Sequence, residues 1–392
     1  MCDLTSSAPT SASPSTLSAA PGAATSGTAT CCPDAAEFKI RPTRTDYYGF
    51  DDKTDMVASG TDPYWIARPG TAPSDRKSRD GAVWLSVARG QTTKATIDFT
   101  NNITCIGNCT FEVRPASIAT VVTGSITTDR AEFEIRGNAA GDATVVVVCN
   151  GKDIGWVHVA CYTNLTFRVG MCRINQSITT GTGAAATTAL TLPRAAMTVP
   201  TYQSFFDDVY RDAAVTVTLT ALPDFNVPAT TNITAGGGFW DAGGTMSSAH
   251  FMANTSTGVY PVTDAINTAV KRANPGYDKY LFLMPQPGTR GAGVSYVNGF
   301  ARGIGGAYAI FFNDDSGTYS TAAHEFGHMI NLRHPNDSSG TGQFPVHLRA
   351  PSTSTATNNV PPDDTLNLMG YGSPRPNRKR LRYLQWKAIS GR

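Results

Sequence analysis

Residues 324–334 read HEFGHMINLRH and contain three of the six histidines in the chain. His324 and His328 are four residues apart, so on a helix they lie on one face and can reach the same metal ion. Glu325 follows the first histidine, where a carboxylate can act as a general base on metal-bound water. If the helix ends after His328, the chain can turn back and bring His334 to the same ion. Three protein ligands and one open position are typical of a catalytic zinc.

Two other interpretations of this segment are weaker. A surface helix that is merely rich in histidine would need the ligand positions and the glutamate to fall into place by accident. A structural zinc site is usually four-coordinate and rich in cysteine, and no cysteine follows Cys172. A structural metal also has no use for Glu325. The pattern therefore favours a catalytic metal site.

The segment resembles the long motif of the metzincin metallopeptidases, H-E-x-x-H-x-x-G-x-x-H. The histidine and glutamate positions match, and the one departure is Asn331, where the family has glycine. Asparagine is the residue other than glycine that best tolerates a positive φ, so it can end the helix in the same left-handed conformation. We therefore predict φ > 0 at Asn331. The resemblance implies one catalytic Zn²⁺ held by His324, His328 and His334.

A second family feature lies in residues 367–371, which read NLMGY. This segment resembles the metzincin Met-turn, so Met369 is expected to pack beneath the histidines without ligating the metal. Ordinary core packing is the alternative role for this methionine. Tyr371 occupies the place of a tyrosine that in astacins and serralysins reaches the metal or the tetrahedral intermediate. It is a candidate catalytic residue that stabilises the oxyanion, or else a half-buried aromatic residue in a turn.

The overall composition limits the class of partner. The 392 residues carry a net charge of +2, and charged residues make up 16% of the chain, against about 25% in average globular proteins. This balance does not point to nucleic acid, and no run of eighteen apolar residues predicts a transmembrane helix. We expect a monomer that acts on a protein or peptide substrate.

The first part of the chain bears on localisation. Residues 1–36 are rich in Ser, Thr, Ala, Pro and Gly, which predicts a disordered tether. Residues 1–30 contain no Lys or Arg and no apolar segment typical of a signal peptide. The eight cysteines and low charge nevertheless favour an oxidising compartment, so we expect a secreted or cell-envelope protein, periplasmic or extracellular. The chain is then already mature or exported by a route that reads no such signal; a cytosolic location is the alternative.

Several cysteines have specific alternative roles. Cys2 is a candidate lipid anchor, as in mature bacterial lipoproteins, or an incidental residue near a flexible end. Cys31 or Cys32 could inhibit the zinc as part of a propeptide. Cys105 and Cys109 could bridge a tight hairpin, although the sequence leaves the disulfide connectivity open.

Two domains are predicted after an extended or packing segment at residues 37–80. Residues 81–163 show short alternating strands about ten residues apart, which is typical of a β-sandwich and resembles bacterial immunoglobulin-like domains. Residues 149–153 predict a hairpin turn. Residues 164–392 mix helices and strands. The fold class is therefore an all-β immunoglobulin-like sandwich followed by an α+β metzincin-like catalytic domain with a mixed sheet and an active-site helix. The expected strands are 82–87, 95–99, 111–113, 132–135, 145–148, 156–159, 165–169, 215–219, 280–283 and 308–312, and the expected helices are 204–212, 261–273 and 377–389.

The surroundings of the motif suggest where a substrate binds. By resemblance, the strand at residues 306–311 is the sheet edge that pairs with an extended substrate. Asp314 and Asp315 are expected to cap the active helix, with calcium binding as the rarer alternative. Residues 335–366 predict a long loop near the cleft, in which His347 is an exposed histidine rather than a fourth ligand. His250 is interpreted in the same way.

These features predict a zinc-dependent endopeptidase that uses a Glu-activated zinc-bound water. One alternative is a non-catalytic binding or adhesion protein in which the peptidase fold is vestigial. Another is a secreted effector toxin that uses the same chemistry on one narrow target.

Overall fold

The computed structural model describes just over half of the chain. None of the helices among the described residues is long and apolar enough to cross a membrane. The predicted tether, Cys2, Cys31, Cys32, Cys105, His250, the Asp314–Asp315 pair, the loop at 335–366 with His347, and Tyr371 lie outside the described residues. The described residues are 38–41, 50–54, 82–99, 106–180, 187–191, 197–227, 246–247, 261–284, 288–289, 296–312, 318–334, 367–369, 381 and 383–391.

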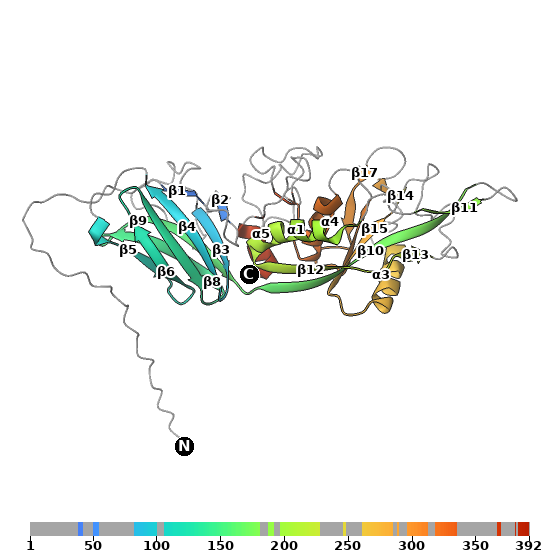
Figure 1. Cartoon of the computed structure of the whole chain (residues 1–392), viewed down its shortest axis with the longest axis horizontal. Helices are drawn as coiled ribbons and strands as arrows, with labels where there is room; N and C mark the ends of the chain where they lie inside the picture. Colours follow the sequence, from blue (N-terminus) through green and yellow to red (C-terminus); the bar gives the residue numbers. More distant parts are fainter. Residues whose placement is uncertain are drawn as a thin grey trace, which may run out of the picture. The chain divides into compact units, whose positions relative to one another are not determined.

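Two β-sheets enclose the first hydrophobic core (Figure 1). One sheet has the order β1-β4-β7-β6 and the other the order β2-β3-β9-β8-β5. In β7, Ala131, Phe133 and Ile135 point into the core and alternate with more exposed residues, as expected for a strand with one buried face. The strands are β1 (Phe38–Arg41), β2 (Phe50–Thr54), β3 (Ala82–Ala88), β4 (Thr92–Phe99), β5 (Cys109–Arg114), β6 (Ala119–Ile126), β7 (Arg130–Gly137), β8 (Gly141–Cys149) and β9 (Lys152–Tyr162).

The β structure predicted for residues 81–163 is present, and the immunoglobulin-like assignment stays a prediction. The hairpin turn is confirmed, since Asn150 and Gly151 both have positive φ, 50° and 73°, between β8 and β9. The segment at 37–80 contributes β1 and β2, which pair with β4 and β3. The sequence interpretation missed β6, because this edge strand is mostly exposed and carries no clear alternation.

The disulfide differs from the proposed hairpin bridge. Cys109 bonds to Cys149, not to Cys105. The two bonded cysteines are directly opposite each other in the antiparallel register of β5 and β8, with Cα atoms 4.1 Å apart. That separation lies close to the range that a disulfide can span. The register of the two strands, which the sequence did not reveal, therefore determines the partner.

The second part of the chain forms the mixed sheet that was predicted. Its order is β11-β10-β15-β19-β18, and β12 and β13 also pair with β10. Strands β12, β10, β15 and β19 run parallel, whereas β18 is antiparallel to β19. A small sheet of β14 (Met246–Ser247), β16 (Gly288–Thr289) and β17 (Tyr296–Val297) lies apart. The main strands are β10 (Leu165–Thr180), β11 (Thr187–Thr191), β12 (Val215–Ala221), β13 (Phe225–Val227), β15 (Lys279–Met284), β18 (Gly299–Ala301) and β19 (Tyr308–Phe312).

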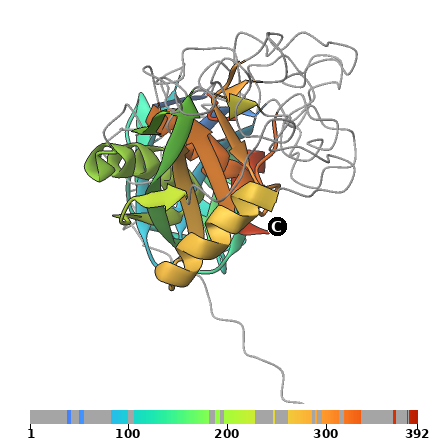
Figure 2. The same ribbon diagram turned by 90° about the vertical axis from the view of Figure 1, so that its right-hand side faces the viewer.

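Helices cover both faces of this sheet, with α3 and α1 on opposite sides (Figure 2). Leu281 and Leu283 of β15 belong to the core that α1 and α4 share, whereas Tyr280 and Phe282 belong to the core beneath α3. Burial on both faces explains why β15 and β19 are apolar almost throughout, without alternation. The helices are α1 (Val199–Tyr210), α3 (Pro261–Ala273), α4 (Thr318–Met329) and α5 (Tyr383–Ser390).

The edge of the sheet is not where the sequence interpretation placed it. The strand expected as the edge, at 306–311, corresponds to β19, which lies between β15 and β18. The edge strand is β18, which contains only Gly299, Phe300 and Ala301. Three residues are too few to produce a recognisable strand pattern. The helix expected at 204–212 also begins earlier, at Val199, and α5 begins later than expected, at Tyr383.

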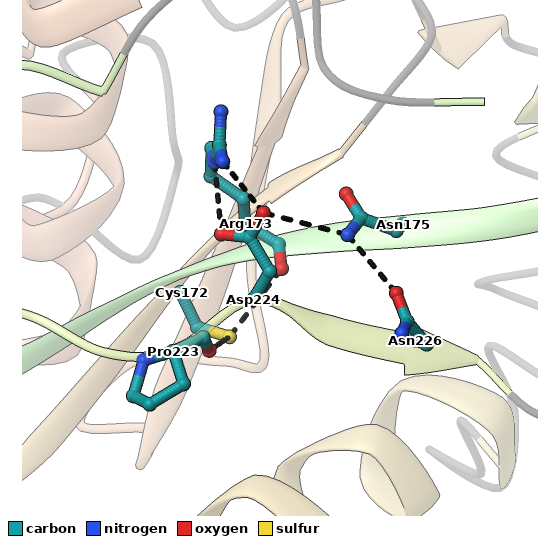
Figure 3. Close-up of polar contacts among 6 residues, drawn as sticks. All are labelled: Cys172, Arg173, Asn175, Pro223, Asp224 and Asn226. Carbon is teal, nitrogen blue, oxygen red and sulfur yellow. Dashed lines mark hydrogen bonds and ion pairs between the residues drawn. The ribbon is translucent and has the colours of Figure 1, made fainter. Parts of the chain in front are cut away.

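A polar cluster joins β13 to the middle of β10 (Figure 3). Asp224 accepts hydrogen bonds from Nε and Nη2 of Arg173, at 2.9 and 2.6 Å. Asn175 donates through Nδ2 to Asn226 Oδ1 at 3.0 Å. The hydrogen bond from Arg173 holds the pKa of Asp224 below its usual value. These contacts fix the register of a strand that has only three residues.

Helix α5 contacts the β-sheets of the first part of the chain. The Tyr383 ring stacks on Trp84, with centroids 3.6 Å apart and an interplanar angle of 9°. Its hydroxyl donates to Asp142 Oδ2 at 2.7 Å, and Lys387 Nζ lies 3.9 Å from the same oxygen. Residues on both sides of the predicted boundary at 163/164 thus share one hydrophobic core. The boundary itself stays a prediction.

Candidate metal centre

Helix α4 carries His324, Glu325 and His328 and ends in a Schellman motif. Asn331 has φ 77°, which confirms the predicted positive φ. The Leu332 N–H donates to Gly327 O at 2.9 Å, and the Asn331 N–H donates to His328 O at 3.2 Å. These are the two hydrogen bonds that define the motif, with Asn331 in the position that usually holds glycine. The chain therefore reverses direction directly after the helix.

The reversal brings His334 against the two helical histidines. Its Nε2 atom lies 2.9 Å from His324 Nε2 and 3.0 Å from His328 Nε2. His328 is buried, whereas His324 and His334 are partly exposed. The three ligand atoms lie within 4.8 Å of one another, so this cluster could hold a metal ion.

Backbone carbonyls set the tautomers of the two helical histidines. His324 Nδ1 lies 2.9 Å from Leu368 O, and His328 Nδ1 lies 2.7 Å from Leu332 O. A carbonyl oxygen only accepts, so each Nδ1 carries the hydrogen, and in the neutral imidazole each Nε2 presents a lone pair. Orientation of a ligating histidine through its other ring nitrogen is usual in metal sites.

The donor set fits a zinc ion. A proton on His334 Nε2 can satisfy only one of the two facing lone pairs well, whereas a cation among the three nitrogens attracts all of them. Tetrahedral zinc with Zn–N bonds of about 2.0–2.1 Å holds its ligand nitrogens about 3.3 Å apart. The distances of 2.9 and 3.0 Å are a few tenths of an ångström shorter. A small outward movement of the rings reaches zinc geometry.

Met369 lies directly against the active helix. It is fully buried, and a β-carbon placed on Gly327 would lie only 2.8 Å from Met369 Sδ. Its backbone N–H donates to Asn367 Oδ1 at 2.9 Å, and the buried Gln385 of α5 accepts from Asn367 Nδ2 at 2.7 Å. Helix α5 thus holds in place the segment whose Leu368 carbonyl orients His324.

Glu325 is 6% exposed and lies between the helix and the sheet edge. A β-carbon on Gly299 of β18 would lie 2.7 Å from Glu325 Oε1, so strand and carboxylate are in close contact. On the other side, Tyr210 of α1 donates its hydroxyl to the Ala323 carbonyl. Burial, with the charge of Glu325 adding to it, raises the pKa of Tyr210 well above its usual value. The phenol therefore stays protonated and anchors α4 to α1.

The structure brings together five of the six residues predicted from the sequence: His324, Glu325, His328, His334 and Met369. Tyr371 lies outside the described residues. The sequence interpretation missed the supporting residues Gly299, Asn367 and Gln385, and the Leu332 and Leu368 carbonyls. Proximity to Met369 was a weak signal for Asn367, and the others carry no local signal because they are far from the motif or act through the backbone.

Asn331→Ala is expected to destabilise the protein by about 1–2 kcal/mol, the cost of a left-handed conformation for a residue with a β-carbon. It is also expected to weaken zinc binding, because His334 follows the turn. Asn331→Gly should remain close to the wild type in both properties. Thermal unfolding and competition with a chromophoric chelator measure the two effects. Equal behaviour of the alanine and glycine variants would show that the turn does not depend on φ at this position.

Comparison with protein-family models and with curated proteins finds no match. Among solved structures, archaemetzincin from Methanopyrus kandleri is 14% identical over 57% of this chain and 93% of that chain, with a TM-score of 0.30. Archaemetzincin from Archaeoglobus fulgidus, complexed with malonate, is 17% identical over 43% and 80%, with a TM-score of 0.23. Domains 4 and 5 of the S-layer protein SbsC are 26% identical over 19% and 40%, with a TM-score of 0.16. Since these scores are below 0.5, the functional assignment depends on the site geometry.

Proposed function

We propose that this protein is a zinc-dependent endopeptidase. The observation that carries the proposal is the convergence of three imidazole nitrogens, 2.9 and 3.0 Å apart, beside the buried carboxylate of Glu325. Three neutral histidines leave a coordination position open for water or substrate, and the adjacent carboxylate supplies a base. A structural metal site would not require that carboxylate.

His324, His328 and His334 would hold the zinc ion. When bound, zinc would supply Lewis acidity, which activates water near neutral pH and polarises a carbonyl group. The Leu368 and Leu332 carbonyls keep Nδ1 of His324 and His328 protonated, so that Nε2 remains available as the ligand. Met369 packs beneath the cluster as apolar support, in the manner of a Met-turn.

Glu325 carries the proton in this proposal. As a carboxylate, it accepts a proton from the attacking water and later donates it to the nitrogen of the leaving amine. Its position on α4 directly after His324 keeps it beside the metal ligands. Tyr371 remains a proposed oxyanion donor on the basis of its spacing from Met369.

Strand β18 is the proposed docking edge for the substrate. It lies at the end of the sheet order, and its Gly299 contacts Glu325. An extended peptide that adds to this edge would pair through its backbone, largely independent of side chains. The scissile bond would then lie near the carboxylate. We accordingly propose a peptide or protein as substrate.

We also propose a secreted or cell-envelope location. The Cys109–Cys149 disulfide supports it, because such bonds persist in oxidising compartments and are rare in the cytosol. A lipid anchor at Cys2 and inhibition by Cys31 or Cys32 remain predictions from the sequence.

A test of the reaction class is digestion of a peptide library, followed by mass spectrometry. Endopeptidase activity is expected to produce new internal termini, each pair of fragments summing to the parent mass plus one water. Cleavage of a single protein only would favour the narrow-target effector. Intact peptides and proteins after incubation with zinc-loaded protein would contradict the proposed function and favour a binding protein.

A further inference from the structure

We infer that Gly299 sets the position of the Glu325 carboxylate. A β-carbon at Gly299 would lie 2.6 Å from Glu325 Cγ and 2.7 Å from Glu325 Oε1. Real β-carbons are essentially never found within 3.0 Å of such atoms, so any residue other than glycine must displace something. Gly299 is therefore a positioning residue, and its role in catalysis depends on the proposed function of Glu325.

The strand that carries Gly299 is held at both ends. Gly299 is opposite Phe311 in the register of β18 and β19. Just before it, Asn298 O accepts from the Phe312 N–H at 2.8 Å, and just after the strand the Arg302 N–H donates to Tyr308 O at 3.0 Å. A retreat of β18 from the helix would strain these hydrogen bonds. The strand is therefore not the part that yields easily.

The helix is also held. The same β-carbon would lie 2.8 Å from Thr321 Cγ2, one helical turn before Glu325. Threonine is β-branched and has little χ1 freedom in a helix. Helix α4 is packed through the fully buried Phe326 and through the hydrogen bond from Tyr210 to Ala323 O. The flexible end of Glu325 is the group that must move.

The side-chain pattern of β18 agrees with this close approach. Ala301, two residues after Gly299, belongs to the core on the α4 side of the sheet, whereas Phe300 packs against the core on the α3 side. Both residues of β18 that face α4 are therefore small. Only at Gly299 does the space run out completely, because the neighbour there is the carboxylate.

Gly299→Ala is expected to lower kcat about 100-fold, which is the typical effect of moving a reacting group by about 1 Å. KM should remain within about threefold, and the zinc content should remain one per chain, because no metal ligand contacts residue 299. Gly107→Ala is the matched control, since a β-carbon there meets nothing within 4 Å and the backbone needs no positive φ. A kcat equal to that of the control would overturn the inference.

A thermal double-mutant cycle tests the contact without any activity measurement. Gly299→Ala is expected to lower Tm by several degrees in the wild type and by less than half as much in the Glu325→Ala background, where most of the collision is gone. Equal decreases in both backgrounds would show that residue 299 does not act on Glu325. The cycle remains valid for a protein that fails to cleave peptides, so a failure of the proposed function is distinguishable from a failure of this inference.

Discussion

Glu325→Gln is expected to lower kcat/KM for peptide hydrolysis by about 10²–10⁴-fold, while the protein keeps one zinc ion per chain. Glutamine has nearly the shape of glutamate but cannot accept the proton of the attacking water. The proposed metal ligands are all histidines, and their tautomers depend on the Leu368 and Leu332 carbonyls. Loss of the carboxylate charge therefore removes the proton carrier and leaves the binding site intact.

Steady-state kinetics on a fluorogenic peptide and elemental analysis of the same samples measure both quantities. Glu132→Gln is a matched control, because Glu132 is an exposed residue of β7 in the other part of the chain. The control should retain wild-type activity. Wild-type activity in Glu325→Gln would mean that another group moves the proton and that the mechanism is wrong.

His328→Ala is expected to abolish stoichiometric zinc binding and all cleavage. His328 is the most buried of the three histidines, and its imidazole is fixed on both sides, by Leu332 O and His334 Nε2. Two remaining ligands leave a much weaker site. Zinc at about 100 times its Kd contributes about 2.7 kcal/mol to the stability of a protein that binds it only when folded. The variant should lose this contribution.

The measurement is thermal unfolding with added zinc and with a chelator. The wild type should have a higher Tm in zinc, whereas the Tm of His328→Ala should not respond. His334→Ala is a useful companion, because it removes a ligand beyond the end of the helix and disturbs the core less. A full zinc response in both variants would exclude the three histidines as the metal site.

The sequence predicted the helix of the site well because its signals are local. The four-residue spacing of His324 and His328 requires only a helix, and the turn at Asn331 depends on the backbone preference of one residue. The apolar runs of β15 and β19 likewise indicated strands buried on both faces. These features arise from neighbouring residues, so no tertiary information was needed.

The parts that were missed depend on strand register and on backbone groups. The edge strand β18 has three residues, and its identity follows only from pairing with β19. The pairing of Cys109 with Cys149 follows from the register of β5 and β8. The amide pair of Asn367 and Gln385 links residues eighteen positions apart through tertiary packing. Local sequence patterns cannot encode such contacts.

The most direct test of the central claim is a digestion of one unfolded protein substrate by three preparations of the wild-type chain. The first is zinc-loaded, the second is stripped with a chelator, and the third is stripped and then given back one equivalent of zinc. We predict fragments from the first and third preparations and intact substrate with the second. Equal cleavage by the stripped protein, or none by a preparation that contains one zinc per chain, would contradict a zinc endopeptidase built on His324, His328, His334 and Glu325.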